Sequence, residues 1–338
     1  MNILIIMNHV LTDPDRVTFY NIDGRHQYIK RGIQRVFKSK NKVFYFLNLV
    51  LTAIQLRRHY KRMNVDLIIS GNPRIGFVVG AINRISFCKT AHAVWNFNVH
   101  HVYTGIKRRL SSFALKQVHY LLVYSRHEQR IYSDMLGLAP ERILYKYYSG
   151  PYLEDKRYQS LKSAGGEEYV VSAGFSGRDY AFLAAVAEQM PDVTFFVLTY
   201  PSVLKNISFG SNVKVISGIP EVEYCRYIAN AKLFFLPMKN KETANGHIAI
   251  VQAMCLRTPL LTNMTEGTKD YLQPDINSVI FPDGDVKSTA VLVRKIWTDR
   301  EWSEKIVNQA YQFARERFTI QKEIEAVEQI AASTGGRR

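Results

Sequence analysis

The segment 242–262 places the tightest constraint on what this chain can form. A polar loop ends at Asn245 and Gly246, and apolar residues at helical spacing follow from Ile248 to Leu256. Residues 257–259, Arg-Thr-Pro, close this helix before a short apolar run. The pattern predicts a loop, a buried helix, a turn and a strand, which together make one αβ unit. A helix that begins at a glycine-containing loop presents unpaired N–H groups and the positive end of its dipole, so the unit is also suited to bind a phosphate.

Similar units recur along the chain and predict an α/β protein. Short apolar runs that end in glycine or polar residues lie at 3–6, 65–71, 90–94, 121–125, 169–173 and 193–198. A length of 338 residues, 47% of them hydrophobic, suggests about two domains with cores of their own. The polar stretch 147–166 is rich in Gly and Pro turn signals. We therefore place a linker at 151–166, between a domain of residues 1–150 and one of residues 167–315.

The segment 242–262 resembles the donor-binding signature of the GT-B glycosyltransferases of the large retaining family that builds polysaccharides and glycolipids (family 4-like), E-G-F-G-L-x-x-x-E-A-M-x-x-G-x-P-V-[IV]. Residues 245–248 stand at G-F-G-L, residues 252–254 at E-A-M, and residues 258–261 at the closing x-P-V-I. Both motif glutamates are replaced, by Ala244 and Gln252. In the family the second carboxylate accepts hydrogen bonds from the donor ribose. Gln252 can still accept through its amide oxygen, as a neutral and weaker acceptor.

Four further stretches resemble the same family in the same order. Residues 121–143 resemble the end of its first domain, with an apolar strand, Ser125 as a helix cap and Glu128 completing a capping box. Residues 169–180, 213–238 and 277–285 resemble its phosphate loop, base-contact segment and late turn. The resemblance implies a GT-B fold, which is two doubly wound Rossmann-like domains facing a central cleft, with a last helix at 316–334 that crosses back to the first domain. It also implies a nucleotide-sugar donor in the second domain, an acceptor in the first and retention of configuration.

The donor site is predicted from two loops of the second half. The glycines that follow the strand 169–173 let the backbone approach a pyrophosphate, and the guanidinium of Arg178 can bind it bidentately. The ordinary alternative for Arg178 is a surface residue that caps a helix. The expected donor-binding residues are Gly174, Ser176, Gly177, Arg178, Thr199, Ile219, Asn245, Gly246, His247, Ile248 and Gln252.

Catalysis would come from neutralising the leaving diphosphate, with Arg178 and the helix end at 245–248 supplying positive potential. We expect no cofactor and no metal, since we find no D-x-D positioned to hold one; the D-x-D at 283–285 lies in a late turn. Asp13 or Asp15 would be the base if the enzyme inverts, although residues in such loops more often form turns. His100 or His101, in the aromatic loop 95–103, stands where the family places a polar group toward the donor sugar; the alternative is a loop histidine with a structural role.

The net charge of +16 lies in the first half of the chain. Residues 1–160 contain 25 Lys and Arg against 9 Asp and Glu, whereas residues 161–338 contain 20 of each. This asymmetry indicates an anionic partner for the first half, such as nucleic acid, lipid headgroups or a phosphorylated acceptor. Segments 27–42 and 43–62 combine apolar and basic residues as membrane-surface helices do; the alternative is a strand at 44–46, a core helix and a solvated basic end. The expected membrane or acceptor contacts are Arg57, Arg58, Lys61, Arg62, Lys107, Arg108 and Arg109.

Other features bear on the compartment. Three cysteines without metal-ligand spacing indicate a reducing environment, the amino terminus reads as a strand and not a signal peptide, and no stretch approaches 18 apolar residues. We therefore expect a cytoplasmic protein that is peripheral on the inner face of the cytoplasmic membrane.

The sequence predicts a metal-independent glycosyltransferase that moves a sugar from a UDP- or GDP-sugar to a lipid-linked or anionic glycan in polysaccharide or glycolipid biosynthesis. Three alternatives stay open: an inactive GT-B partner subunit, a nucleotide-sugar 2-epimerase and a nucleic-acid-binding protein. The last lacks a recognisable reader helix or stacking platform, so we expect no nucleic acid partner.

Overall fold

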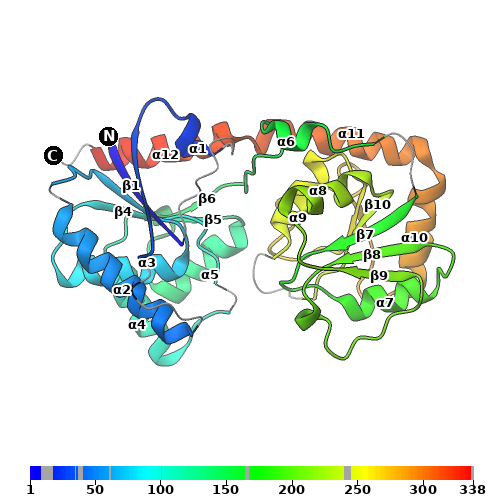
Figure 1. Ribbon diagram of the computed structural model, residues 1–338, viewed down its shortest axis with the longest axis horizontal. Helices are drawn as coiled ribbons and strands as arrows, with labels where there is room; N and C mark the ends of the chain where they lie inside the picture. Colours follow the sequence, from blue (N-terminus) through cyan, green and yellow to red (C-terminus); the bar gives the residue numbers. More distant parts are fainter. Residues whose placement is uncertain are drawn as a thin grey trace. The chain divides into compact units, whose positions relative to one another are not determined.

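The computed structural model describes residues 1–8, 18–34, 36, 41–60, 62–99, 101–163, 167–239 and 245–335. These residues form two compact units, each with its own sheet (Figure 1). Unit 1 comprises Met1–Lys146 and Glu323–Arg338, and unit 2 comprises Tyr147–Lys322. The predicted α/β class with two parallel sheets is confirmed.

The described part of unit 1 contains a six-stranded parallel sheet in the order β2-β1-β3-β4-β5-β6. Its strands are short and mostly apolar because a parallel sheet is buried on both faces. They are β1 (Asn2–Met7), β2 (Gln27–Gly32), β3 (Leu67–Ser70), β4 (Ala91–Val94), β5 (Tyr120–Val123) and β6 (Ile143–Tyr145). The strand order reverses between β1 and β3, as in other doubly wound sheets.

Helices cover both faces of this sheet. They are α1 (Phe19–Ile22), α2 (Lys42–His59), α3 (Pro73–Ile85), α4 (Gly105–Leu115), α5 (Arg126–Leu136) and α12 (Ile320–Gly335). Leu4 and Ile6 of β1 pack with α2 and α3, whereas Ile3 and Ile5 pack with Val327 and Ile330 of α12. Figure 1 shows α12 on one side of the sheet and α2, α3 and α4 on the other. One layer of unit 1 therefore comes from the far end of the sequence.

Unit 2 repeats the arrangement in the order β12-β11-β10-β7-β8-β9, again all parallel among the described residues. Its strands are β7 (Tyr169–Ala173), β8 (Thr194–Leu198), β9 (Val213–Ile216), β10 (Leu233–Leu236), β11 (Leu260–Thr262) and β12 (Val279–Ile280). Its helices are α6 (Lys156–Gln159), α7 (Tyr180–Glu188), α8 (Glu221–Asn230), α9 (His247–Cys255), α10 (Val286–Thr298) and α11 (Arg300–Arg317). Residues of α7 and α10 share one core cluster, and residues of α8, α9 and α11 share the other.

Polar residues at the helix starts fix where several helices begin. The Asn72 side chain accepts from Ile75 N–H at α3, and Asp285 accepts from Ser288 N–H at α10. At α5 the predicted capping box is present, since Ser125 Oγ accepts from Glu128 N–H. The Glu128 carboxylate is fully buried and accepts from Tyr124 N–H, Tyr132 O–H and the Asn98 amide. Burial raises the pKa of Glu128 to about 8.

A buried ionic contact holds α12 to the first sheet. Glu323 accepts from the Trp95 indole N–H at 2.9 Å and from Lys146 Nζ at 2.5 Å. Trp95 follows β4 and Lys146 follows β6, so one carboxylate joins two strand ends to the helix. Little of either charged side chain is exposed, 12% for Lys146 and 6% for Glu323.

Three regions differ from the sequence expectations. Residues 27–32 form the edge strand β2 and not a helix, because they pair with β1 from Asn2 to Met7; exposed lysine and arginine are common on edge strands. The alternative strand at 44–46 is also wrong, since those residues lie within α2. The segment expected as a linker, 151–166, contains α6, and its Tyr152, Tyr158 and Leu161 are buried in the core of unit 2.

None of the helices in the described ranges is long and apolar enough to cross a membrane.

We expect Glu323→Ala to destabilise unit 1 by about 3–5 kcal/mol, because it leaves the Lys146 ammonium buried without its partner. Urea unfolding followed by the fluorescence of Trp95 would measure the change. Glu323→Gln, whose amide oxygen can still accept from the indole N–H, should lower the stability of unit 1 by less than the alanine variant does. Equal stabilities for the wild type and the alanine variant would contradict the assigned role of this contact.

We expect the stabilising effect of Glu128 to depend on pH. Between the ordinary carboxyl pKa of 4.5 and a folded value of about 8, the folded chain keeps a proton that the unfolded chain has lost. Stability therefore falls as pH rises through this window, by up to about 1.4 kcal/mol per pH unit. The free energy of unfolding of Glu128→Gln minus that of the wild type should accordingly grow between pH 5 and pH 8, and a flat difference would contradict the raised pKa.

Candidate functional site

The candidate site lies at the carboxyl edge of the second sheet. Strands β7 and β10 are neighbours, but the chain leaves them in opposite directions, to β8 on one side and β11 on the other. Such a switch point opens a crevice outside the strand ends, where ligands of doubly wound folds bind. The loop 174–178 follows β7 and the loop 237–239 follows β10. Met238 and Arg178 pair across the switch point, and Lys239 N–H donates to Gly177 O.

Arg178 is held by the backbone of its own loop. Its Nε donates to Ala173 O at 2.9 Å, and one Nη donates to Ser176 O at 2.8 Å. Burial lowers the pKa of the guanidinium, which still stays charged, as arginine does in proteins. The side chain is thus neither a simple surface cap nor a freely extended phosphate ligand. It shapes the loop and fixes a positive charge at the switch point. Its second Nη group takes part in neither of these two hydrogen bonds.

Gly174 makes this placement of Arg178 possible. Its φ is +107°, a conformation that side chains rarely adopt. A Cβ at this position would lie 2.5 Å from an Nη atom of Arg178. The glycine therefore allows the guanidinium of Arg178 to lie close to the backbone that follows β7. The sequence alone suggested that a pyrophosphate makes this close approach.

The start of α9 forms the other side of the site. Gly246 is its N-cap residue with φ +93°, and no side chain caps the first turn. The N–H groups of Ile248 and Ala249 have no acceptor among the described residues, and the Ile250 N–H donates to Gly246 O. Ser176 Oγ donates to Asn245 Oδ1 at 2.8 Å and so links the β7 loop to this helix end. The predicted residues Gly174, Ser176, Gly177, Arg178, Asn245, Gly246 and Ile248 therefore come together.

The other predicted donor residues lie at neighbouring strand ends or inside the core. Thr199 is buried at the end of β8, and Ile219 is half-buried after β9, behind Gly218. His247 packs against the rings of Tyr148 and Tyr271. Gln252 is buried one turn into α9, and its amide donates to Tyr152 O–H at 3.0 Å.

Sequence reasoning missed Asn263, which supports the site from behind. Directly after β11, its side chain accepts from Met238 N–H at 2.8 Å and donates to Met238 O at 2.9 Å. It also donates to Asp283. A polar residue immediately after a buried strand at the carboxyl edge was the signal available in the sequence.

The residues predicted for the first unit are only partly described. Asp13, Asp15, His100 and Lys61 lie outside the described residues, and His101 is exposed in the loop after β4. Of the basic contacts, Arg57 donates to Ser86 and Arg108 donates to the carbonyls of Asp134 and Met135, which satisfies the end of α5. Arg58, Arg62, Lys107 and Arg109 are exposed. Within the described ranges, no three His, Cys, Asp or Glu side chains are grouped as metal ligands would be.

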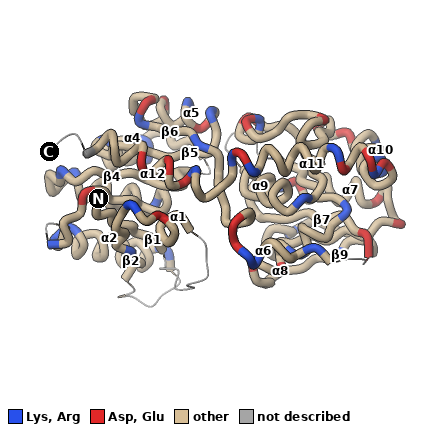
Figure 2. The backbone as a smooth tube through the Cα atoms, turned by 90° about the horizontal axis from the view of Figure 1, so that it is seen from above, with Lys and Arg blue, Asp and Glu red and all other residues tan. Residues whose placement is uncertain are grey.

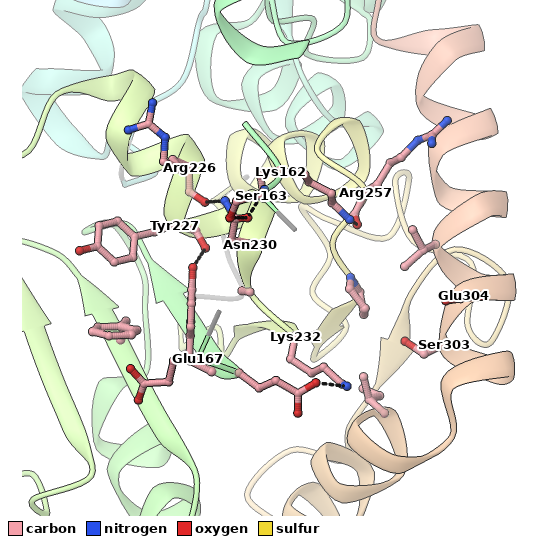
Figure 3. Close-up of a pocket in the computed structure, with 18 of the residues that line it drawn as sticks. Lys162, Ser163, Glu167, Arg226, Tyr227, Asn230, Lys232, Arg257, Ser303 and Glu304 are labelled. Atoms are coloured by element: carbon pink, nitrogen blue, oxygen red, sulfur yellow. Dashed lines mark hydrogen bonds and ion pairs between the residues drawn. The ribbon is translucent and has the colours of Figure 1, made fainter. Parts of the chain in front are cut away.

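A hollow of about 780 Å³ lies at the opposite, amino edge of the second sheet (Figure 3). It is lined by cations, but Lys232 pairs with Glu168, Arg226 with Glu223 and Arg300 with Glu304. Because these charges are largely neutralised in pairs, the hollow provides weaker attraction for a diphosphate than the uncapped helix start and Arg178 do.

One family model and several solved structures match this chain. Residues 203–313 match the family model of the glycosyl transferases group 1. Direct comparison with curated protein sequences gives no match.

Several solved structures resemble the whole chain. A glycosyltransferase from Rickettsia africae ESF-5 aligns with a TM-score of 0.71 and 9% identity, over 100% of this chain and 99% of that one. HepE from Anabaena, in complex with UDP and glucose, aligns with a TM-score of 0.70 and 13% identity, over 98% of this chain and 100% of that one. WaaG, a glycosyltransferase involved in lipopolysaccharide biosynthesis, aligns with a TM-score of 0.64 and 12% identity, over 98% of this chain and 99% of that one. The two parallel sheets and these alignments show that the chain has the GT-B fold, and residues 203–313 contain a domain that matches the glycosyl transferases group 1.

Proposed function

We propose that this protein is a glycosyltransferase, specifically a hexosyltransferase, that takes its sugar from a nucleotide-sugar held at the carboxyl edge of the second sheet. The observation that carries the proposal is the meeting of Arg178, the glycine loop after β7 and the uncapped start of α9 at one switch point. Backbone N–H groups, a helix dipole and a fixed guanidinium all favour a diphosphate there.

In the proposed reaction the bond between the sugar C1 and the diphosphate oxygen breaks, and the diphosphate keeps the electron pair. The N–H groups of Ile248 and Ala249 and the charge of Arg178 stabilise the negative charge as it develops. The acceptor hydroxyl forms the new bond to C1, and its proton passes to the oxygen of the departing diphosphate. We assign retention of configuration from the family resemblance, with Asp13 or Asp15 as the first base to test if the enzyme inverts. The proposal needs no metal, because the protein itself supplies the positive potential.

Uracil is the first base to examine. HepE binds UDP, and the turn of Gly218 and Ile219 follows β9, close in the strand order to the β7 loop. Backbone groups of this turn are the proposed base contacts. Gln252, with its amide bound to Tyr152, keeps its oxygen as the acceptor proposed for the ribose.

The proposed acceptor is a lipid-linked or anionic glycan in cell-surface polysaccharide or glycolipid biosynthesis. The excess of positive charge in residues 1–160 supports an anionic partner for the first half of the chain. WaaG, of the same fold, is involved in lipopolysaccharide biosynthesis. We place the protein in the cytoplasm, peripheral on the inner face of the membrane.

A charge placed at the start of α9 tests the donor site without disturbing the core. Ile248 is 42% exposed in the first turn. We expect Ile248→Glu to raise the Kd for the preferred nucleoside diphosphate at least about tenfold, or about 1.4 kcal/mol, whereas the same carboxylate stabilises the helix dipole. Ile248→Lys should lower the Kd. Calorimetric titration with UDP, GDP, CMP, dTDP and ADP measures both effects.

Val291→Glu is the matched control, since it adds the same charge on α10 at a side chain that is 66% exposed. Equal nucleotide affinity for Ile248→Glu and wild type would refute the placement of the diphosphate. Failure of all five nucleotides to bind the wild type would support an inactive partner subunit instead. Conversion of UDP-N-acetylglucosamine to its 2-epimer without an acceptor would identify an epimerase.

Arg178→Lys keeps the positive charge but loses the fork that holds the loop. We expect it to lower stability by about 1–3 kcal/mol, because the carbonyls of Ala173 and Ser176 lose their donors. Urea unfolding monitors this effect, and nucleotide affinity, measured separately, reports the role of the charge. An unchanged unfolding midpoint would contradict the structural part of the role of Arg178.

A further inference from the structure

Helix α2 is apolar on its outer side as well as on its inner side. Its buried residues are Asn48, Leu49, Thr52, Ala53 and Leu56, and Thr52 Oγ1 donates to Asn48 O and accepts from Gln34 N–H. The exposed side is apolar and continues along the helix at spacings of three and four residues. It consists of Val43, Phe46, Leu47, Leu51 and Ile54. A helix that is apolar on its outer side requires a cover.

Helix α4 has a second exposed apolar stripe. Ile106, Leu110 and Phe113 are spaced by four and three residues, and 75% of Ile106 and 64% of Leu110 are exposed. Lys107 and Arg109 flank this stripe.

The two stripes belong to one helical layer. Helix α2 packs against α3 and α3 packs against α4, on the side of the first sheet opposite α12 (Figure 1). Arg57 of α2 donates to Ser86 at the end of α3, and Arg84 of α3 donates to Phe113 O of α4. We call the exposed residues of the two stripes, Val43, Phe46, Leu47, Leu51, Ile54, Ile106, Leu110 and Phe113, the α2–α4 apolar face.

The sequence around this face is almost free of acidic residues. Between Asp23 and Glu128 the only acid is Asp66, against nineteen lysines and arginines. Figure 2 colours Lys and Arg at the ends of α2 and no acid on it. Arg58, Arg62 and Arg109 are exposed and form no ion pair with the described residues.

We propose that the α2–α4 apolar face docks on the surface of an anionic lipid bilayer. Its leucine, isoleucine and phenylalanine side chains enter the boundary between headgroups and acyl chains, and Lys42, Arg58, Arg62 and Arg109 bind the lipid phosphates. Apolar side chains beside lysine and arginine are the composition of helices that lie in this boundary. The proposal specifies the membrane partner of the proposed function, but it uses unit 1 alone and does not depend on the donor site.

The positive charge around the α2–α4 apolar face favours a bilayer over a second copy of the chain as its partner. In a two-fold dimer this face would meet itself, so its cations would face the same cations. An anionic bilayer offers the opposite charge together with an apolar layer deep enough for the exposed side chains.

Sedimentation of the full chain with vesicles tests the docking. We expect binding to vesicles of phosphatidylglycerol and phosphatidylcholine in equal parts, and little binding to phosphatidylcholine alone. Leu47→Ser with Leu51→Ser, and Ile106→Ser with Leu110→Ser, should each reduce the partition coefficient at least about tenfold. Arg58→Ser with Arg62→Ser should weaken binding at about 0.1 M salt more than at 1 M, where the Debye length is only about 3 Å.

Ile276→Ser with Val291→Ser is the matched control, because it removes two exposed apolar side chains of unit 2. Unfolding temperatures near that of the wild type would show that the variants fold. Absence of wild-type binding to anionic vesicles, or equal binding by the α2 and α4 variants, would overturn the proposal. So would a dimer in light scattering that the same substitutions dissociate. UDP titration of the same samples keeps a failure of donor binding distinct from a failure of docking.

Discussion

A parallel sheet must be covered on both faces, and the first sheet meets this requirement with a helix from the other end of the chain. Ile3 and Ile5 of the first strand pack on Val327 and Ile330 of α12, and Glu323 fixes the helix to the ends of β4 and β6. The contact joins residues 228 positions apart. Unit 1 is therefore not a contiguous segment, and a boundary drawn near residue 150 would remove one of its layers.

The proposed donor site depends mainly on backbone geometry. Gly174 and Gly246 have positive φ, Arg178 is held by carbonyl oxygens, and the anion-binding groups at the start of α9 are N–H groups. Such a site needs few special side chains. This gives a physical reason why Gln252 can stand where the glycosyltransferase motif that the sequence resembles has glutamate.

The sequence predicted the described part of this αβ unit, 245–262, well, because one helical period and one Asn-Gly loop specify both the buried face and the exposed helix start. The capping box at Ser125 was predicted for the same reason, since its residues are neighbours in the chain. The contacts of Arg178 were not predictable, because its partners are backbone carbonyls whose positions depend on the fold. The strand at 27–32 was misread as a helix because an edge strand lacks a clear alternation. The sequence indicated that α2 is apolar and basic but not which residues face outward, because apolar residues lie on both sides of the helix and Asn48 and Thr52 are buried.

The position of α12 has a consequence for how the protein is made. The ribosome synthesises the strands of the first sheet early, but the helix that covers one of their faces emerges only after all of unit 2. Unit 2, which is continuous from Tyr147 to Lys322, can complete its core as soon as it leaves the exit tunnel. The half of the protein that is translated first is thus the last to finish folding, and its uncovered sheet face must remain protected from aggregation during that interval.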